Sequence, residues 1–306
     1  MQKAKRLRRS RRVVAFGLLA YVMVLSVLSC GRPADRLILF PPKGFINAGR
    51  ATQHFIDVDG RRLEIWTARS PAVRAGAGGQ PAAYVLEFCG NATRAEQIAQ
   101  YVADRWKNHP IEAWVVNYPG YGASEGGAKL NLIPPAALAA YDEIAKRDPG
   151  KPIFLEANSL GTTAVLYVAA RRPAAGLILQ NPPPLRTLIR GKYGWWNAWL
   201  LAVPVSLEIP EQLDSVANAR KIHAPAIFLL ADHDEVVPPA YQKLILDAYA
   251  GEKRVIPLNG STHNSSVTGD AAKQLSDEID WLWKRGHPNP VRPRRCICVV
   301  MTRSGP

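Results

Sequence analysis

Residues 154–161 read FLEANSLG, and a helix-compatible run from Thr162 to Ala170 follows directly. The stretch predicts a strand, a sharp turn and a helix, with the hydroxyl of Ser159 at the tip of the turn. So tight a turn requires small residues two positions before and two positions after the serine. Ala157 and Gly161 hold these positions, so alanine replaces the first glycine of a Gly-x-Ser-x-Gly pattern. Such short patterns occur by chance, and this one gains weight only from its place in the chain.

Strand-like and helix-like segments alternate on both sides of this turn. Strands are expected at 54–59, 62–66, 83–88, 111–117, 153–157, 176–180, 226–231 and 253–257, and helices at 93–107, 135–146, 160–170, 239–250 and 270–283. Asp59-Gly60 between the first two strands indicates a β-hairpin. The mostly apolar strands predict an α/β fold, with a mostly parallel central sheet and helices on both faces. Functional residues of such sheets gather at the carboxyl ends of the strands.

One insertion interrupts the alternation, at about 181–221. It is rich in apolar side chains, among them Trp195, Trp196, Trp199, Leu200, Leu201, Val203 and Val205. We expect it to form a short helical lid over the carboxyl edge of the sheet. Most of its tryptophan rings should pack the lid onto the body, with one or two facing a ligand. An apolar lid favours a substrate with an aliphatic or aromatic acyl part.

An activated serine needs a base and an acid that orients the base. The acid should follow the strand at 226–231, where Asp232, Asp234 and Glu235 compete; Asp234 is preferred and Asp232 is the alternative. The base should follow the last strand, and His263 lies there in a small polar loop. We therefore expect Ser159, Asp234 and His263 to form a catalytic triad.

Two backbone amides are candidates for an oxyanion hole, which stabilises negative charge on the substrate oxygen. One is the amide of Leu160, directly after the serine, and the other is that of Asn91, in the loop after the strand at 83–88. Gly90 allows this loop to turn inward. Loss of one such donor typically lowers turnover by ~10²–10³.

With the order Ser159, Asp234, His263, the chain from about residue 50 to 285 resembles the α/β-hydrolase superfamily. It is similar to small members whose oxyanion loop reads His-Gly-Asn-Ala, which include acyl-protein thioesterases and many uncharacterised bacterial hydrolases. Residues 90–92 match that loop, and residues 117–126 resemble the group's tyrosine- and glycine-rich loop. Cys89 departs from the pattern because it stands where histidine is usual.

The resemblance implies acyl transfer to water without a metal or an organic cofactor. Ser159 would attack an ester or thioester carbonyl, His263 would take its proton, and Asp234 would stabilise the imidazolium. Two alternatives stay open: a serine peptidase of the same fold, and a catalytically inactive binding protein that keeps the hydrolase fold. Oligomeric state is not predicted.

The net charge of +14 comes from the two ends of the chain. Residues 1–12 carry seven Lys or Arg and residues 284–306 carry six, and neither segment has an acidic residue. The rest of the chain holds 26 basic against 25 acidic residues. A nucleic-acid-binding face on the folded domain is therefore not expected.

The N-terminal segment, residues 1–30, has the pattern of a targeting or anchoring sequence. An uncharged run from Val13 to Ser29 follows the basic cluster and ends at Cys30. Two interpretations stay open: lipidation of Cys30 after removal of a signal peptide, and an uncleaved membrane anchor. Both place the body outside the cytoplasmic membrane, in the bacterial periplasm, because positive residues stay inside.

The remaining segments complete the predicted domain organisation. Residues 31–50 should be an irregular linker draped over the fold, residues 51–285 the catalytic domain, and residues 286–306 a disordered basic tail. Cys89 should be a small buried apolar residue. Cys296 and Cys298 alone are too few ligands for a metal site.

Overall fold

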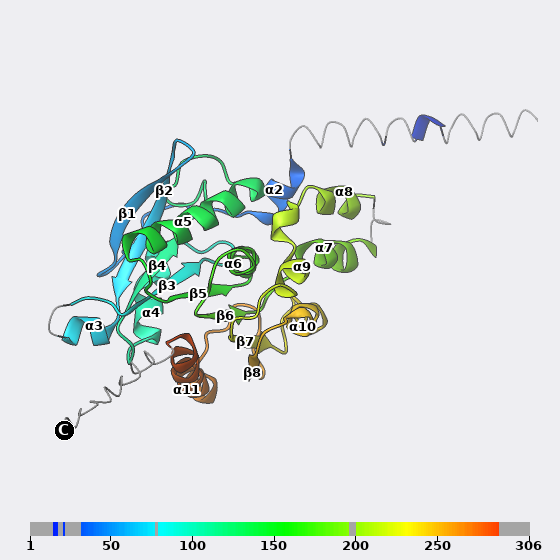
Figure 1. The fold of residues 1–306 in the computed structure, drawn as a ribbon. Coiled ribbons are helices and arrows are strands. Elements are labelled where there is room, and N and C mark those ends of the chain that lie inside the picture. The colour runs from blue at the N-terminus through cyan, green and yellow to red at the C-terminus, as the bar shows by residue number, and fades with distance from the viewer. Residues whose placement is uncertain (1–14, 18–20, 22–31, 77–78, 196–199, 288–306) are drawn as a thin grey trace, which may run out of the picture.

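The computed structural model describes residues 15–17, 21, 32–76, 79–195 and 200–287 (Figure 1). Its centre is one eight-stranded sheet in the order β1-β2-β4-β3-β5-β6-β7-β8. The strands are β1 (Thr52–Val58), β2 (Arg61–Arg69), β3 (Ala83–Phe88), β4 (Ile111–Val116), β5 (Ile153–Asn158), β6 (Gly176–Gln180), β7 (Ala226–Ala231) and β8 (Lys253–Leu258). β2 pairs antiparallel with β1 and β4, and every other neighbouring pair is parallel. The predicted mostly parallel sheet is confirmed.

The first two strands form the predicted hairpin. Asp59 and Gly60 both have positive φ angles, 51° and 75°. Positive φ at both central residues of a two-residue turn matches the right-handed twist of the flanking strands, which explains the Asp-Gly pair.

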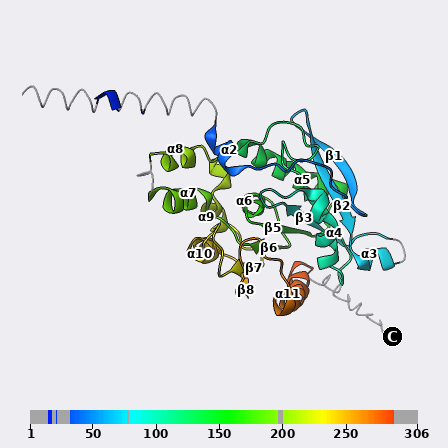
Figure 2. The same cartoon turned by 180° about the vertical axis from the view of Figure 1, so that it is seen from behind.

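Helices cover both faces of the sheet (Figures 1 and 2). α5 (Ile133–Arg147), α6 (Gly161–Ala169) and α10 (Pro239–Ala248) bury apolar residues against one face, and α4 (Ala95–Arg105) and α11 (Gly269–Gly286) against the other. Strands with two covered faces must be apolar on both, and β4 is buried at every position. The sequence around α4 predicts one apolar face with Ile98, Tyr101, Val102 and Trp106, but Tyr101 is half-exposed and its ring lies beneath the Arg105 guanidinium.

The segment before the sheet corrects the expected irregular linker at 31–50. It contains a short helix, α2 (Pro33–Ile38), whose Asp35 side chain accepts a hydrogen bond from the amide of Leu130. The amide of Ala34 donates to the carboxylate of Glu208. α2 is therefore held by partners far away in the sequence, which local sequence patterns do not reveal. A second short helix, α3 (Pro71–Ala75), lies in the glycine- and alanine-rich loop before β3.

The inserted segment between β6 and β7 is helical, as expected. It holds α7 (Leu185–Tyr193), α8 (Ala202–Leu207), η3 (Glu211–Leu213) and α9 (Ser215–Ala219). Leu185 and Val205 are buried in the apolar cluster of the body and pack the insertion onto it. Trp195 does not, because 71% of its surface is exposed. The expectation that most of the insertion's tryptophans pack and that one or two face a ligand is not tested by Trp195 alone.

Several expectations fall outside the described residues. These are the roles of Trp196 and Trp199, the lipidation of Cys30, and the tail that carries Cys296 and Cys298. Within the described part of the chain, none of the helices has the length and apolar character needed to cross a bilayer.

Candidate active site

The turn after β5 places Ser159 at the carboxyl edge of the sheet. Ser159 has a φ angle of 51°, a strained conformation for a residue with a side chain. Its amide donates to the carbonyl of Gln180, and its own carbonyl accepts hydrogen bonds from Thr162, so the turn is tied on both sides. A Cβ atom at position 161 would lie 2.1 Å from the carbonyl oxygen of Phe88. Only glycine fits there, because the end of β3 passes directly behind the turn.

Ala157, two residues before the serine, does not meet the same constraint. It is 2% exposed and packs in the apolar cluster on the α5 and α6 side of the sheet. Its methyl group therefore has room in the core. This explains why alanine can stand where the short pattern has glycine.

Ser159, His263 and Asp234 form one hydrogen-bonded chain at this edge. His263 Nε2 lies 2.8 Å from Ser159 Oγ, and His263 Nδ1 lies 2.7 Å from Asp234 Oδ2. The three residues come from the loops after β5, β8 and β7 and are each no more than 9% exposed. A serine hydroxyl bonded to an imidazole, itself bonded to a buried carboxylate, is an arrangement that activates serine as a nucleophile.

The carboxylate of Asp234 is fully occupied. Its Oδ1 accepts hydrogen bonds from the amides of Val236 and Val237, at 2.8 and 2.7 Å. Its Oδ2 accepts a hydrogen bond from Gln242 Nε2 at 3.1 Å, in addition to the contact with His263. The alternative acid, Asp232, instead pairs with exposed His233, which holds the pKa of Asp232 below its usual value.

Two buried amides that support this chain are absent from the sequence-based prediction. Gln242, on α10, is fully buried and also donates to the carbonyl of Val237, which orients its amide toward Asp234. Asn181, directly after β6, donates to the carbonyl of His263 at 3.3 Å and accepts from the amide of Ala231. Neither carries a motif. The only sequence signal is an amide residue next to a strand end or on an otherwise apolar helix face.

The two candidate oxyanion amides lie in the loops that flank the serine. Within the part of the chain that the structure describes, neither the Asn91 amide nor the Leu160 amide donates to a protein acceptor. Ala92, next to Asn91, has a positive φ of 57°, which turns the loop after β3. A free amide at such a turn can donate to a ligand oxygen.

The side chain of Asn91 anchors its own loop. Its Oδ1 accepts hydrogen bonds from the amide of Phe40 at 3.0 Å and from the hydroxyl of Tyr121 at 2.9 Å, and its Nδ2 donates to the carbonyl of Ile38. Burial raises the pKa of Tyr121 to about 12, so its hydroxyl stays protonated and donates. The segment after α2 and the tyrosine-rich loop therefore both position the oxyanion loop.

Cys89 lies directly before this loop and is a buried apolar residue, as expected. It is 1% exposed, and burial raises the pKa of its thiol, as do the nearby carboxylates of Glu87 and Glu96. Its carbonyl accepts a hydrogen bond from Tyr118 at 2.9 Å. The backbone of the loop is thus held without the histidine that is usual at this position.

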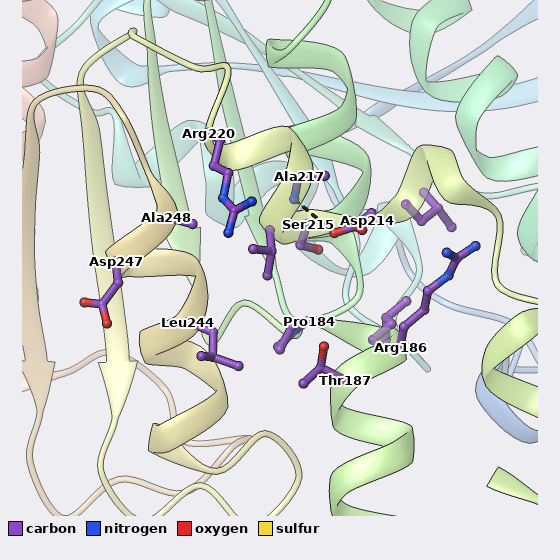
Figure 3. A pocket seen from close by; sticks show the side chains of 13 residues that line it. Pro184, Arg186, Thr187, Asp214, Ser215, Ala217, Arg220, Leu244, Asp247 and Ala248 are labelled. Carbon is purple, nitrogen blue, oxygen red and sulfur yellow. Dashed lines mark hydrogen bonds between the residues drawn. The ribbon is translucent and has the colours of Figure 1, made fainter. Parts of the chain in front are cut away.

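A large cavity lies away from this site. It has a volume of about 740 Å³ and opens between α7, α9 and α10 (Figure 3). Its thirteen lining residues include Arg186, Arg220 and Asp247, but none of the three residues of the hydrogen-bonded chain. Nor does it include a direct sequence neighbour of these three residues, so this cavity is separate from the hydrogen-bonded chain. Among the described residues, no three His, Cys, Asp or Glu side chains are grouped so that they could hold a metal ion.

Comparison with known protein sequences finds distant relatives. The chain is 25% identical over 279 residues to an uncharacterized protein of Mycobacterium tuberculosis. The alignment covers 88% of this chain and 94% of that protein. It is 28% identical over 159 residues to the lysophosphatidylserine lipase ABHD12 of Danio rerio, over 47% of this chain and 40% of the fish protein. No protein-family model matches the chain.

Comparison with solved structures finds esterases. Est1E from Butyrivibrio proteoclasticus, solved with ferulic acid, aligns with a TM-score of 0.58 at 16% identity over 76% of this chain and 98% of Est1E. The Pyrococcus furiosus esterase PF2001 aligns with a TM-score of 0.61 at 13% identity, over 81% of this chain and 97% of the esterase. Strand order, the turn at Ser159 and these likenesses together identify the chain as a protein of the α/β-hydrolase fold.

Proposed function

We propose that the protein is a membrane-associated serine hydrolase that cleaves carboxylic esters or thioesters. The observation that carries the proposal is the hydrogen-bonded chain from Ser159 through His263 to Asp234, buried at the carboxyl edge of the sheet. The esterases among its structural neighbours, and a distant relative named a lipase, agree with ester-bond chemistry.

The mechanism follows from the positions of these groups. His263 Nε2 accepts the proton of Ser159 Oγ as that oxygen attacks the substrate carbonyl carbon. The new oxyanion lies between the amides of Asn91 and Leu160, which have no protein acceptor among the described residues. Asp234 keeps the Nδ1 proton on the imidazole and stabilises its charged form. His263 then returns the proton to the leaving alcohol or thiol, and activates the water that releases the acid.

The nucleophile is tested by labelling with a fluorophosphonate probe. Wild-type protein should be labelled on Ser159 and should hydrolyse p-nitrophenyl esters. Ser159→Ala should abolish labelling and lower turnover by about 10⁴-fold or more. Ser276→Ala, on α11, is the matched control and should behave as wild type. A folded wild-type protein that is not labelled would exclude a serine hydrolase, and labelling of the Ser159→Ala variant would exclude this nucleophile.

Membrane association rests on the N-terminal segment. The uncharged run Val13–Ser29 follows a basic cluster and ends three residues before Arg32, which precedes α2. The full chain should sediment with membranes and face the periplasm, whereas a chain that starts at Arg32 should not sediment. Mass spectrometry of the membrane-extracted protein distinguishes the two kinds of attachment: a chain that begins at a lipid-modified Cys30 indicates a lipid anchor, and an unmodified chain that begins at Met1 or Gln2 indicates an uncleaved helix. Full-length protein in the soluble fraction would contradict membrane association.

A further inference from the structure

Behind the turn at Ser159 lies a polar cavity with no assigned role. It has a volume of about 250 Å³ and lies between α4, the ends of β3, β5 and β6, and the loop after β8. Three residues of its wall are the direct sequence neighbours of site residues: Gly90 precedes Asn91, Asn158 precedes Ser159, and Asn264 follows His263. The cavity therefore adjoins the candidate oxyanion loop, the nucleophile and the base.

Three strand-end side chains in this wall point to the same face of the sheet. Val85, Phe154 and Ile178 are buried on the face of the sheet that α4 and α11 cover. Each of the three polar residues lies an even number of positions further along the same strand: Glu87 on β3, Asn158 on β5 and Gln180 on β6. Side chains that are an even number of residues apart on a strand share a face. Asn158 and Gln180 are also direct neighbours across the β5 and β6 pair. The polar groups thus form one row at the carboxyl edge.

None of these three side chains has a polar partner in the described part of the chain. Glu87 is 5% exposed, yet its carboxyl group makes neither a hydrogen bond nor an ion pair there, and Glu87 Oε2 is fully buried. Asn158 Oδ1 is likewise buried and unpartnered. Native proteins pair nearly all their buried polar groups. Nearby Glu156 differs from these side chains, because its Oε2 accepts a hydrogen bond from Trp106 and its Oε1 forms an ion pair with Arg105. The unpaired row is therefore suited to a ligand.

The chemistry of the wall selects the kind of ligand. Burial raises the pKa of Glu87 to about 8, so at neutral pH its carboxyl group is uncharged and both donates and accepts hydrogen bonds. The amides of Asn158 and Gln180 and the hydroxyls of Thr93 and Ser266 also combine donor and acceptor. The charge of Arg105 is matched by Glu156. A neutral wall of this kind disfavours ions and complements hydroxyl groups, which have the same dual capacity.

We infer that this cavity is the subsite for the alcohol portion of the ester substrate, and that the alcohol is a small neutral polyol of the glycerol type. The inference rests on the proposed esterase function. It divides the substrate between two surfaces, with the apolar insertion on the acyl side and the polar cavity on the alcohol side. The space suits a small group, since water occupies ~30 Å³ per molecule and the cavity equals about eight waters.

The test compares two esters of one acid on the full-length protein in detergent: glyceryl monobutyrate and propyl butyrate. Propanol lacks two hydroxyl groups that glycerol offers to the wall, and loss of their hydrogen bonds predicts a preference in kcat/KM of about tenfold for the glyceryl ester. Glu87→Leu and Asn158→Ala should each bring this ratio toward one. Glu87→Gln, which keeps a donor and an acceptor, should retain most of the preference.

The outcomes separate this inference from the proposed function. Equal kcat/KM for the two esters in wild type overturns the subsite and leaves the esterase intact. A preference that survives both Glu87→Leu and Asn158→Ala also overturns it, because the polyol is then recognised elsewhere. If neither ester is cleaved and fluorophosphonate does not label Ser159, the esterase proposal itself fails. If free glycerol binds, seen by saturation-transfer NMR, but the ester ratio is one, the cavity binds a free polyol and its assignment to the substrate alcohol is wrong.

Discussion

Two buried carboxyl groups at the same edge of the sheet have opposite surroundings. Asp234, after β7, meets four donors: two backbone amides, Gln242 and His263. Glu87, at the end of β3, meets none within the described residues. A carboxylate surrounded by donors is fixed in place and can orient a partner. A carboxyl group without partners keeps its hydrogen-bonding capacity for something that arrives later. Under the proposed function, the first group organises the catalytic residues and the second recognises a ligand.

The largest effect is expected when the orienting group is neutralised. Asp234→Asn keeps the shape but presents an amide to Nδ1, which favours the wrong imidazole tautomer for accepting the serine proton. We expect kcat for p-nitrophenyl butyrate to fall by roughly 10⁴-fold, equal to about 5 kcal/mol of transition-state stabilisation. Steady-state kinetics measure this, with circular dichroism to verify the fold.

Asp232→Asn is the matched control, since Asp232 lies two residues away but pairs with exposed His233. Its kcat should stay within about twofold of wild type, as surface ion pairs contribute little. If Asp232→Asn is the more damaging substitution, the assignment of the acid is wrong.

The second effect concerns stability and distinguishes the two carboxyl groups by pH. The folded protein binds the Glu87 proton up to about pH 8, whereas the unfolded chain releases it near 4.5. The stability that depends on neutral Glu87 is therefore complete below about pH 4.5 and is lost as the pH rises toward 8. With ~1.4 kcal/mol per pH unit, the loss is on the order of 3–5 kcal/mol.

Glu87→Gln removes this titration, so urea unfolding followed by tryptophan fluorescence should show the variant losing less stability than wild type between pH 5 and 8.5. Glu211→Gln, at an exposed position, is the control and should follow the wild-type dependence. Parallel pH dependences for wild type and Glu87→Gln would show that Glu87 is already ionised in the folded protein.

The parts of the fold that local patterns encode were predictable from the sequence. Apolar runs of strand length place β3, β6 and β7 with the bounds that the structure has, because burial on both faces leaves a continuous signal. The candidate triad residues were also predictable, since each follows a strand whose end lies at one edge. The prediction used only the order of strands along the chain. Whether the three side chains meet depends on the order of the strands in the sheet.

Other features depend on contacts between distant segments. The short helix α2 is held by Glu208 and by the amide of Leu130, so its six residues carry no sufficient signal of their own. The amide of Asn181 reaches the carbonyl of His263, 82 residues later. Glu87 reads as one polar residue in an apolar strand. Its lack of partners becomes evident only when α4 and the neighbouring strands surround it.

The smallest expected effect concerns the side chain that completes the surroundings of Asp234. Gln242→Met keeps a similar volume but removes the donor that lies 3.1 Å from Asp234 Oδ2. Three donors remain, so the carboxylate should stay in place but orient His263 less precisely. One hydrogen bond to a charged group is worth ~1.5–3 kcal/mol, which predicts a fall in kcat of about tenfold or somewhat more.

Because Gln242 is placed behind the acid and not beside the substrate, KM should stay nearly constant. The wild-type preference between glyceryl and propyl esters should also persist, since the polar cavity is unaffected. A rise in KM without a fall in kcat would mean that Gln242 contributes to substrate binding. If Gln242→Met loses the glyceryl preference and Glu87→Leu keeps it, the alcohol is recognised near Asp234 and not near Glu87. The roles assigned to the two sites would then be wrong.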